Sequence, residues 1–185
     1  NSLAGLEFLC GIPASVGGAI IRNAGVSWPQ RLEIAAFVEE LRVMDKSGRI
    51  TTLGKERLKF SYRHFNLKGY IILGARFKLG KDRKKNIGLK MQKFWDYRKS
   101  TQELRYPSAG CIFKNIDGQS SGRLIDLCGL KGRRTGDAAI SNKHANFIIN
   151  LGKANACDIL ALMKLARQEV KKKFKINLEP EIEVI

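Results

Sequence analysis

The chain has 185 residues, of which 44% are hydrophobic and 28% are charged, and this composition is typical of a globular protein and excludes a disordered one. Its formal net charge of +17 favours anionic ligands or partners. The longest apolar runs, such as 70–75 and 159–163, are far below the roughly 20 residues that a membrane helix needs, so we expect no membrane association.

Four cysteines are spread along the chain without any CxxC pair: Cys10, Cys111, Cys128 and Cys157. This spacing argues against a zinc site and is typical of reduced thiols in a cytoplasmic protein. We therefore expect a cytoplasmic location, no metal and no disulfide.

Residues 5–25 contain five glycines and a proline among apolar residues, with little charge. Glycine is used where the main chain takes a positive φ or where a side chain would collide with a packed group. The segment is therefore either a tight loop between buried strands or a place where main chain approaches a flat, phosphate-bearing cofactor. The absence of GxGxxG excludes the Rossmann fingerprint.

The next elements are predicted in chain order. A short helix is expected over 31–37, two strands over 40–45 and 49–53 joined by a turn at 46–48, and a third strand over 70–79. From 82 to about 101 the apolar residues recur at helical spacing, which predicts an amphipathic helix whose apolar stripe packs in a core: Ile87, Met91, Phe94 and Trp95.

The final third alternates strands and helices, which predicts a small α+β unit. Helices are expected over 122–128 and 155–174, and strands near 111–114, 138–141, 147–150 and 181–185. Three basic runs, at 81–85, 131–134 and 171–173, suit either a solvated surface or a nucleic-acid partner. They are not interleaved with aromatic residues as a base-stacking surface would be.

The glycine segment, GLEFLCGIPASVGGAIIRNAG, resembles the flavin-binding signature of the UDP-N-acetylenolpyruvoylglucosamine reductase (MurB) family, GLEFxxGIPGTVGGAxxxNAG. Ala14 and Ser15 stand where the family has Gly-Thr. The resemblance implies FAD and NADPH as cofactors. It also implies cofactor contacts from Gly11, Ile12, Pro13, Val16, Gly17, Gly18, Asn23, Ala24 and Gly25.

Three further motifs resemble the same family in the same order. Tyr62-Arg63 matches a Tyr-Arg pair that supplies a catalytic arginine. In AGCIFKN, Cys111 stands where the family has a proton-donating serine, and a thiol with a pKa of about 8.5 is also protonated at neutral pH. Glu181, in LEPEI, matches a catalytic glutamate. The resemblance further implies substrate contacts from Tyr62, Asn115, Lys143 and His144.

The resemblance implies the second half of a PCMH-type FAD-binding domain over 1–80, a connecting helix over 81–103 and a substrate-binding domain over 104–185. Because the chain begins at Asn1 within the first motif, we expect an N-terminal FAD-binding part to lie upstream. We also expect a monomer.

The implied activity is the NADPH-dependent reduction of UDP-N-acetylglucosamine-enolpyruvate to UDP-N-acetylmuramate in peptidoglycan synthesis, without a nucleic-acid partner. Two alternatives stay open: a basic nucleic-acid-binding module, and a different flavin oxidoreductase of the same superfamily.

Overall fold

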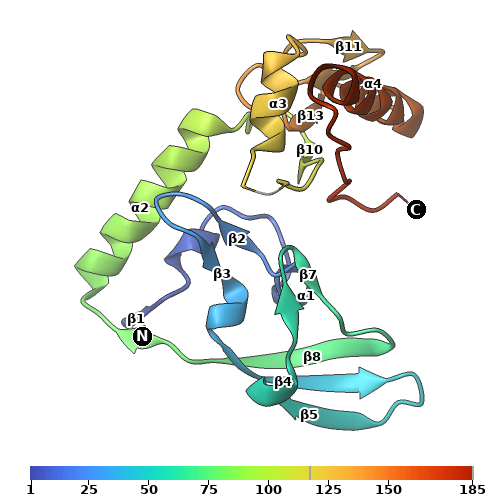
Figure 1. Ribbon diagram of the computed structural model, residues 1–185. Helices are drawn as coiled ribbons and strands as arrows, with labels where there is room; N and C mark the ends of the chain where they lie inside the picture. Colours follow the sequence, from blue (N-terminus) through green and yellow to red (C-terminus); the bar gives the residue numbers. More distant parts are fainter. Residues whose placement is uncertain (117, 185) are drawn as a thin grey trace. The chain divides into compact units, whose positions relative to one another are not determined.

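The computed structural model describes residues 1–116 and 118–184 (Figure 1). The chain divides into two compact units, Asn1–Tyr97 and Arg98–Ile185, each with its own hydrophobic core. The boundary falls within helix α2 (Lys84–Thr101). Among the described residues, no helix combines the length and the apolar character needed to cross a bilayer.

The first unit is built on an antiparallel sheet of three strands in the order β5-β4-β8. These are β4 (Val38–Asp45), β5 (Ile50–Gly54) and β8 (Tyr70–Phe77). The turn between β4 and β5 is held by the Asp45 carboxylate, which accepts hydrogen bonds from the main-chain N–H of Ser47 at 2.9 Å and of Arg49 at 3.0 Å. All three predicted strands are confirmed.

Shorter elements surround this sheet. Three two-stranded pairs form: β1 (Leu3–Ala4) with β9 (Gly80–Lys81), β2 (Gly25–Val26) with β3 (Leu32–Glu33), and β6 (Phe60–Ser61) with β7 (His64–Phe65). The short helices are η1 (Glu7–Leu9), α1 (Val16–Ile21), η2 (Ile34–Ala36) and η3 (Lys55–Arg57).

The short helix predicted over 31–37 is wrong in its first half. Leu32 and Glu33 pair with Val26 and Gly25 as strand β3, and only Ile34–Ala36 forms a helical turn. The sheet partner overrides the local preference because it satisfies the main-chain hydrogen-bonding groups of both segments.

The core of the first unit lies where α1 packs against β8 and β7. Its buried residues are Ala19, Ile20, Ile34, Val38, Leu41, Val43, Leu53 and Phe65. Outside this core, β8 leaves Ile71 exposed to 59%, and Ile50 on β5 is exposed to 56%.

Helix α2 confirms the helix predicted from 82 to about 101, but not the expected core packing of its apolar stripe. None of its residues is buried; Ile87, Phe94 and Trp95 are half-buried and Met91 is exposed. Asp82 precedes the helix and accepts hydrogen bonds from Arg83 N–H and from the side chains of Asn86 and Lys90.

The second unit contains a four-stranded antiparallel sheet in the order β10-β13-β12-β11. Its strands are β10 (Ser108–Cys111), β11 (Arg134–Thr135), β12 (Ala138–Ile140) and β13 (Phe147–Asn150). Helix α4 (Ala156–Phe174) packs on β11 and β12, and α3 (Ser121–Leu127) packs against α4. The core between them includes Ile112, Phe113, Ile125, Ile140, Ile148, Leu162, Met163, Ala166, Val170 and Leu178.

Helix α4 begins and ends where the sequence predicts. Asn155 caps its N-terminus, because its Oδ1 accepts from Asp158 N–H and Asp158 Oδ2 accepts from Asn155 N–H, both at 3.0 Å. Such a capping box satisfies main-chain donors that the first helical turn leaves without partners. The chain leaves the helix through Lys175, whose φ is 63°.

Two strands predicted in this unit are corrected. The strand expected near 111–114 begins earlier, as β10, and ends at Cys111, after which Phe113 forms an isolated bridge with Pro180. The last strand expected over 181–185 is wrong for 181–184, and Ile185 lies outside the described residues. Two main-chain hydrogen bonds flank this bridge, from Lys114 N–H to Glu179 O at 2.9 Å and from Glu181 N–H to Ile112 O at 2.8 Å, and the pairing does not extend further as a strand.

Candidate functional site

The glycine segment places a loop with small side chains at the surface of the first unit. Between η1 and α1, Gly11, Pro13, Ala14 and Ser15 are exposed, as is Val16 at the start of α1, and none carries a charge. Gly11 has a φ of 77°, a conformation that favours glycine. The Ser15 hydroxyl caps α1 by accepting from Gly18 N–H at 3.1 Å.

The glycines of this segment serve different purposes. A Cβ at Gly25 would lie 2.2 Å from the main-chain oxygen of Leu32, so this glycine is required by the close pairing of β2 and β3. A Cβ at Gly17 would meet only Ile72, at 3.8 Å. Packing within the protein therefore requires glycine at position 25 but not at position 17.

The cofactor residues predicted from the sequence likewise fall into two groups, one at the surface and one held within the protein. Gly11, Ile12, Pro13, Val16, Gly17 and Gly18 lie on the exposed loop and the first turn of α1, where the small side chains fit a flat ring laid against the main chain. Ala24 and Gly25 are half-buried and Asn23 is buried. The Ala24 main chain bonds to Ala19 O at 2.8 Å and accepts from Ile34 N–H at 2.9 Å.

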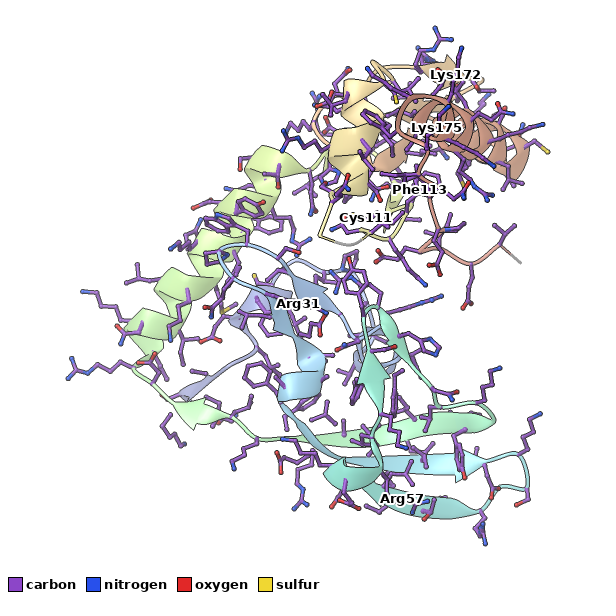
Figure 2. All side chains as sticks on the ribbon, in the orientation of Figure 1. Arg31, Arg57, Cys111, Phe113, Lys172 and Lys175 are labelled. Carbon is purple, nitrogen blue, oxygen red and sulfur yellow. The ribbon has the colours of Figure 1, made fainter. Side chains whose placement is uncertain are left out.

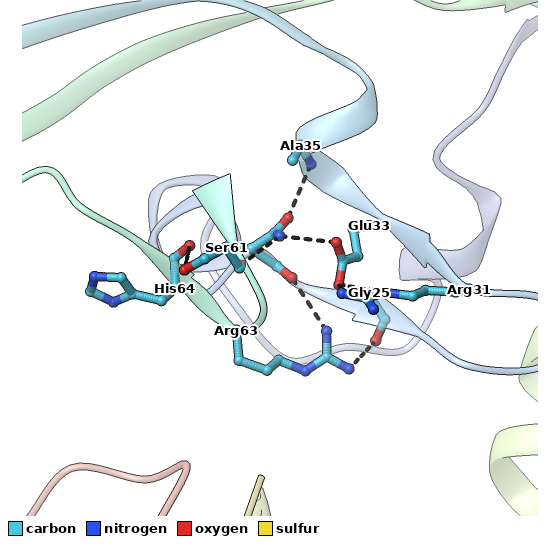
Figure 3. Close-up of polar contacts among 8 residues, drawn as sticks. Gly25, Arg31, Glu33, Ala35, Ser61, Arg63 and His64 are labelled. Carbon is cyan, nitrogen blue, oxygen red and sulfur yellow. Dashed lines mark hydrogen bonds and ion pairs between the residues drawn. The ribbon is translucent and has the colours of Figure 1, made fainter. Parts of the chain in front are cut away.

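Asn23 takes part in a polar network, and Figure 3 labels its partners Glu33, Ala35, Ser61 and Arg63. Its side chain is 1% exposed. The amide nitrogen donates to Glu33 Oε2 at 3.2 Å and to the main-chain oxygen of Ser61 at 3.0 Å, and Oδ1 accepts from Ala35 N–H at 3.2 Å. Glu33 also accepts from Arg31 at 2.8 Å.

Arg63 lies in the turn between β6 and β7 and reaches back to the glycine segment. Its guanidinium donates to Asn23 O at 3.3 Å and to Gly25 O at 3.1 Å. Its φ of 54° is left-handed, which costs a residue with a Cβ about 1–2 kcal/mol. Surrounding contacts must therefore hold this turn.

Tyr62 lies between two cations. The Arg63 guanidinium carbon is 5.1 Å from the centre of the Tyr62 ring, and that of Arg31 is 5.2 Å from it. A ring face attracts cations at this distance. The pair Tyr62–Arg63 thus presents a planar donor group beside an aromatic ring in the first unit.

In the second unit, Cys111 ends strand β10 and Phe113 follows it (Figure 2). Phe113 is held by Asn146, whose Oδ1 accepts from Phe113 N–H at 3.0 Å and whose Nδ2 donates to Phe113 O at 2.7 Å. Asn146 O also accepts from Ile112 N–H at 2.8 Å. Phe113 is only 1% exposed, so water does not reach its main chain. The bonds to Asn146 provide partners for both its N–H and its C=O.

Glu181 and Cys111 lie on neighbouring segments. The Glu181 N–H bond to Ile112 O and the Phe113–Pro180 bridge align the C-terminal stretch with the end of β10. One residue further, the Lys114 ammonium pairs with the Glu179 carboxylate. The structure thus places two of the three predicted catalytic residues, Cys111 and Glu181, on paired segments of the second unit, while Arg63 belongs to the first unit.

The three predicted substrate contacts of this unit have internal roles. Asn115 Oδ1 accepts from Ser121 N–H at 3.1 Å at the start of α3, and the Lys143 ammonium donates to Lys99 O at 3.2 Å. The His144 ring packs on Phe147, with ring centres 4.7 Å apart. Burial lowers the pKa of His144, and the positive charge of Lys131 lowers it further, which favours the neutral imidazole.

Three structurally important residues were not singled out from the sequence: Glu33, Ser121 and Asn146. The signal for Asn146 is present in KHANF, since an asparagine between alanine and phenylalanine in an apolar run predicts a buried, hydrogen-bonded amide. Glu33 and Ser121 give no such local signal, because their partners lie in other segments.

Comparisons with known proteins show which proteins this chain resembles. Residues 102–185 match the family profile described as UDP-N-acetylenolpyruvoylglucosamine reductase, C-terminal domain. The whole chain is 43% identical over 187 residues to the UDP-N-acetylenolpyruvoylglucosamine reductase of Clostridium tetani, of which it spans 60%. It is 45% identical to the reductase of Syntrophobacter fumaroxidans, of which it spans 53%.

The fold is similar as well. The crystal structure of UDP-N-acetylenolpyruvylglucosamine reductase (MurB) from Thermus caldophilus matches 99% of this chain and 65% of its own, with a TM-score of 0.85 and 43% identity. The chain therefore spans about three fifths of the relatives that it matches. Residues 102–185 therefore form a UDP-N-acetylenolpyruvoylglucosamine reductase C-terminal domain, and the chain as a whole is similar in sequence and fold to reductases of that name.

Proposed function

We propose that the chain carries the substrate-reducing machinery of a reductase that converts UDP-N-acetylglucosamine-enolpyruvate to UDP-N-acetylmuramate for peptidoglycan synthesis. The observation that carries the proposal is the alignment of Glu181 with the segment that follows Cys111. Two residues matched from separate family motifs, about 70 positions apart in the sequence, thus lie on paired main-chain segments. The proposal assigns flavin binding to 1–80, the connecting helix to 81–103 and substrate binding to 104–185.

FAD and NADPH, when bound, would supply the hydride that the reduction consumes. The exposed residues Gly11, Pro13 and Val16, together with the half-buried Gly17, would hold the flavin, because their small or apolar side chains let a ring approach the main chain. The basic composition would attract both the nucleotide cofactors and the UDP-sugar.

The remaining work falls to residues of this chain. Hydride addition to the terminal carbon of the enolpyruvyl double bond moves the π electrons onto the adjacent carbon and its carboxylate. The planar fork of the Arg63 guanidinium suits that carboxylate and stabilises the charge that builds on it. Glu181 is the third residue of this set, and a carboxyl donates a hydrogen bond to such a charge only when it is protonated.

Cys111 completes the reaction by donating its proton to the adjacent carbon. The S–H bond breaks, a C–H bond forms, and the thiolate regains a proton from water. This step creates the lactyl ether of the product.

The test separates the two half-reactions in a form of the chain extended with the upstream residues of the Clostridium tetani relative. Cys111→Ala should lower the oxidation of NADPH that depends on the enolpyruvyl acceptor by about 100-fold or more. Bleaching of the flavin by NADPH, measured by its absorbance at about 450 nm, should be unchanged.

Cys128→Ala is the matched control, because Cys128 is another half-buried cysteine of the second unit, at the end of α3. It should keep both half-reactions. Equal loss of both in Cys111→Ala would remove the proton-donor role. A colourless extended protein that binds nucleic acid would replace the proposal with a binding module, and turnover with other acceptors alone would point to a different flavin oxidoreductase.

A further inference from the structure

Asn23 uses its side chain entirely within the protein. Its amide nitrogen has two hydrogens, and these donate to Glu33 Oε2 and Ser61 O, while Oδ1 accepts from Ala35 N–H. With 1% of the residue exposed, the amide has no hydrogen left to offer to a cofactor. The reason for an asparagine here must therefore be sought among its internal partners.

These partners join three separate segments. Ser61 lies in β6, two residues before Arg63, while Glu33 and Ala35 belong to β3 and η2. Arg63 in turn donates to the main-chain oxygen of Asn23. The contacts form a closed ring that runs from the Asn23 amide to Ser61, along the chain to Arg63, and through its guanidinium back to Asn23 (Figure 3).

The ring also explains two unusual backbone conformations. Asn23 has a φ of 41° and Arg63 a φ of 54°, both in the left-handed region. Residues with a Cβ persist there only when their surroundings determine the conformation. Asparagine tolerates this region better than most residues and supplies two donors and an acceptor at the same point.

We propose that Asn23 is a positioning residue for Arg63: it holds the Tyr62–Arg63 turn against the glycine segment and so fixes the guanidinium. This inference rests on the proposed function for its catalytic consequence, and it gives the Asn23 side chain a role other than cofactor contact. Glu33 acts through Asn23, since its carboxylate orients the amide while Arg31 offsets its charge.

The first experiment exchanges donor and acceptor within the ring and observes Arg63 directly by NMR of the 15N-labelled chain. Its guanidinium signals are assigned by their loss in Arg63→Lys. In the unchanged chain we expect resolved Nη signals, because two main-chain oxygens hinder rotation of the group. Asn23→Asp places an oxygen opposite Glu33 and Ser61 O, and the Nη signals should merge.

The double variant Asn23→Asp/Glu33→Gln reverses the pair, because the glutamine amide can donate to the new carboxylate while its oxygen still faces Arg31. It should restore part of the Nη separation. Asn146→Asp is the control, a buried asparagine of the second unit whose amide bonds to Phe113 at both ends. It should leave the Arg63 signals unchanged.

Asn23→Gly covers the case in which Asn23→Asp does not fold, since glycine suits the left-handed backbone and only removes the side chain. Merged Nη signals in the folded glycine variant support the proposal. Resolved signals in either folded variant, or an equal effect of Asn146→Asp, overturn it.

The catalytic consequence is measured separately in the extended, flavin-loaded form. Asn23→Asp should lower kcat for the enolpyruvyl substrate by about 10- to 100-fold, as a small displacement of a catalytic group does, with the KM for NADPH unchanged. The double variant should recover part of the loss. If no form turns over the substrate, the proposed function fails while the NMR result still decides whether Asn23 positions Arg63. Normal kcat in a variant with merged signals overturns the catalytic consequence.

Discussion

Each unit holds a candidate catalytic segment with a buried asparagine, but the two asparagines are used differently. Asn146, 2% exposed, uses both the oxygen and the nitrogen of its amide in hydrogen bonds to one residue, Phe113. These bonds fix the segment after Cys111 beside the start of β13. Asn23, 1% exposed, divides its side-chain bonds among three residues, the charged Glu33, Ala35 and Ser61.

The difference follows from what surrounds each residue. In the second unit, a sheet packs against α4, and α3 packs against that helix. Because this core already exists, the two bonds of the Asn146 amide, called the Asn146 clamp, are enough to attach the segment after Cys111 to it. In the first unit, the glycine segment and the Tyr62–Arg63 turn join through polar contacts instead. We therefore expect a local defect in the second unit mainly to lower its stability. A local defect in the first unit should also displace the Tyr62–Arg63 turn from the glycine segment.

The largest effect is expected from Asn146→Ala. The substitution leaves the N–H and C=O of Phe113 buried without partners, which should lower the free energy of unfolding by about 2–5 kcal/mol. Urea denaturation followed by circular dichroism measures it. Asn177→Ala, at an exposed position after α4, should change stability by less than about 0.5 kcal/mol. A similar small change in Asn146→Ala would contradict the clamp.

Gly25→Ala tests the main-chain geometry of the first unit. The new Cβ would lie 2.2 Å from Leu32 O, so β2 and β3 must separate, and we expect a loss of about 1–3 kcal/mol. Hydrogen exchange should show faster exchange at Val26 and Ala35. The matched control is Gly74→Ala in β8, where a Cβ meets no atom within 4 Å; equal losses in the two variants would refute the steric explanation.

Asn155→Ala removes the N-terminal cap of α4, on which the core of the second unit depends. The expected loss is about 1 kcal/mol, because the first helical turn loses a hydrogen-bond acceptor. Thermal unfolding of the variant measures it, with Asn155→Ser as control, since serine also caps helices and should keep most of the stability. An unchanged midpoint in Asn155→Ala would show that packing alone sets the start of α4.

The smallest effect concerns pH. Burial lowers the pKa of His144 in the folded state, so the unfolded state binds the proton more tightly. The stability that results is fully present above the ordinary histidine pKa of about 6.5 and is lost as pH falls through the lowered value. Unfolding measured from pH 7.5 to 5 should therefore show a weaker acid loss in His144→Gln.

Lys131→Gln serves as a graded control for this prediction. Its charge lowers the same pKa by a smaller amount than burial does, so removing it should reduce the acid loss less than His144→Gln does. An acid loss in His144→Gln equal to that of the unchanged chain would assign the pH dependence to other groups.

The sequence by itself determined the regular elements and the resemblance to one family. The sequence predicts β4, β5, β8, β12 and β13 and the helices α2, α3 and α4 from periodicity and turn residues, which are properties of neighbouring residues. The four motifs are short residue patterns that resemble one family, and the comparisons confirm this resemblance.

Tertiary structure alone decided the rest. The strand β3, the single bridge at Pro180 and the bonds of Asn23 and Asn146 all depend on partners distant in the sequence, such as Ser61 for Asn23 and Phe113 for Asn146. A residue's type fixes which hydrogen bonds it can make, but the fold fixes which groups come within reach. That is why the sequence could name Arg63 and Cys111, and only the structure could identify the two asparagines that hold their segments.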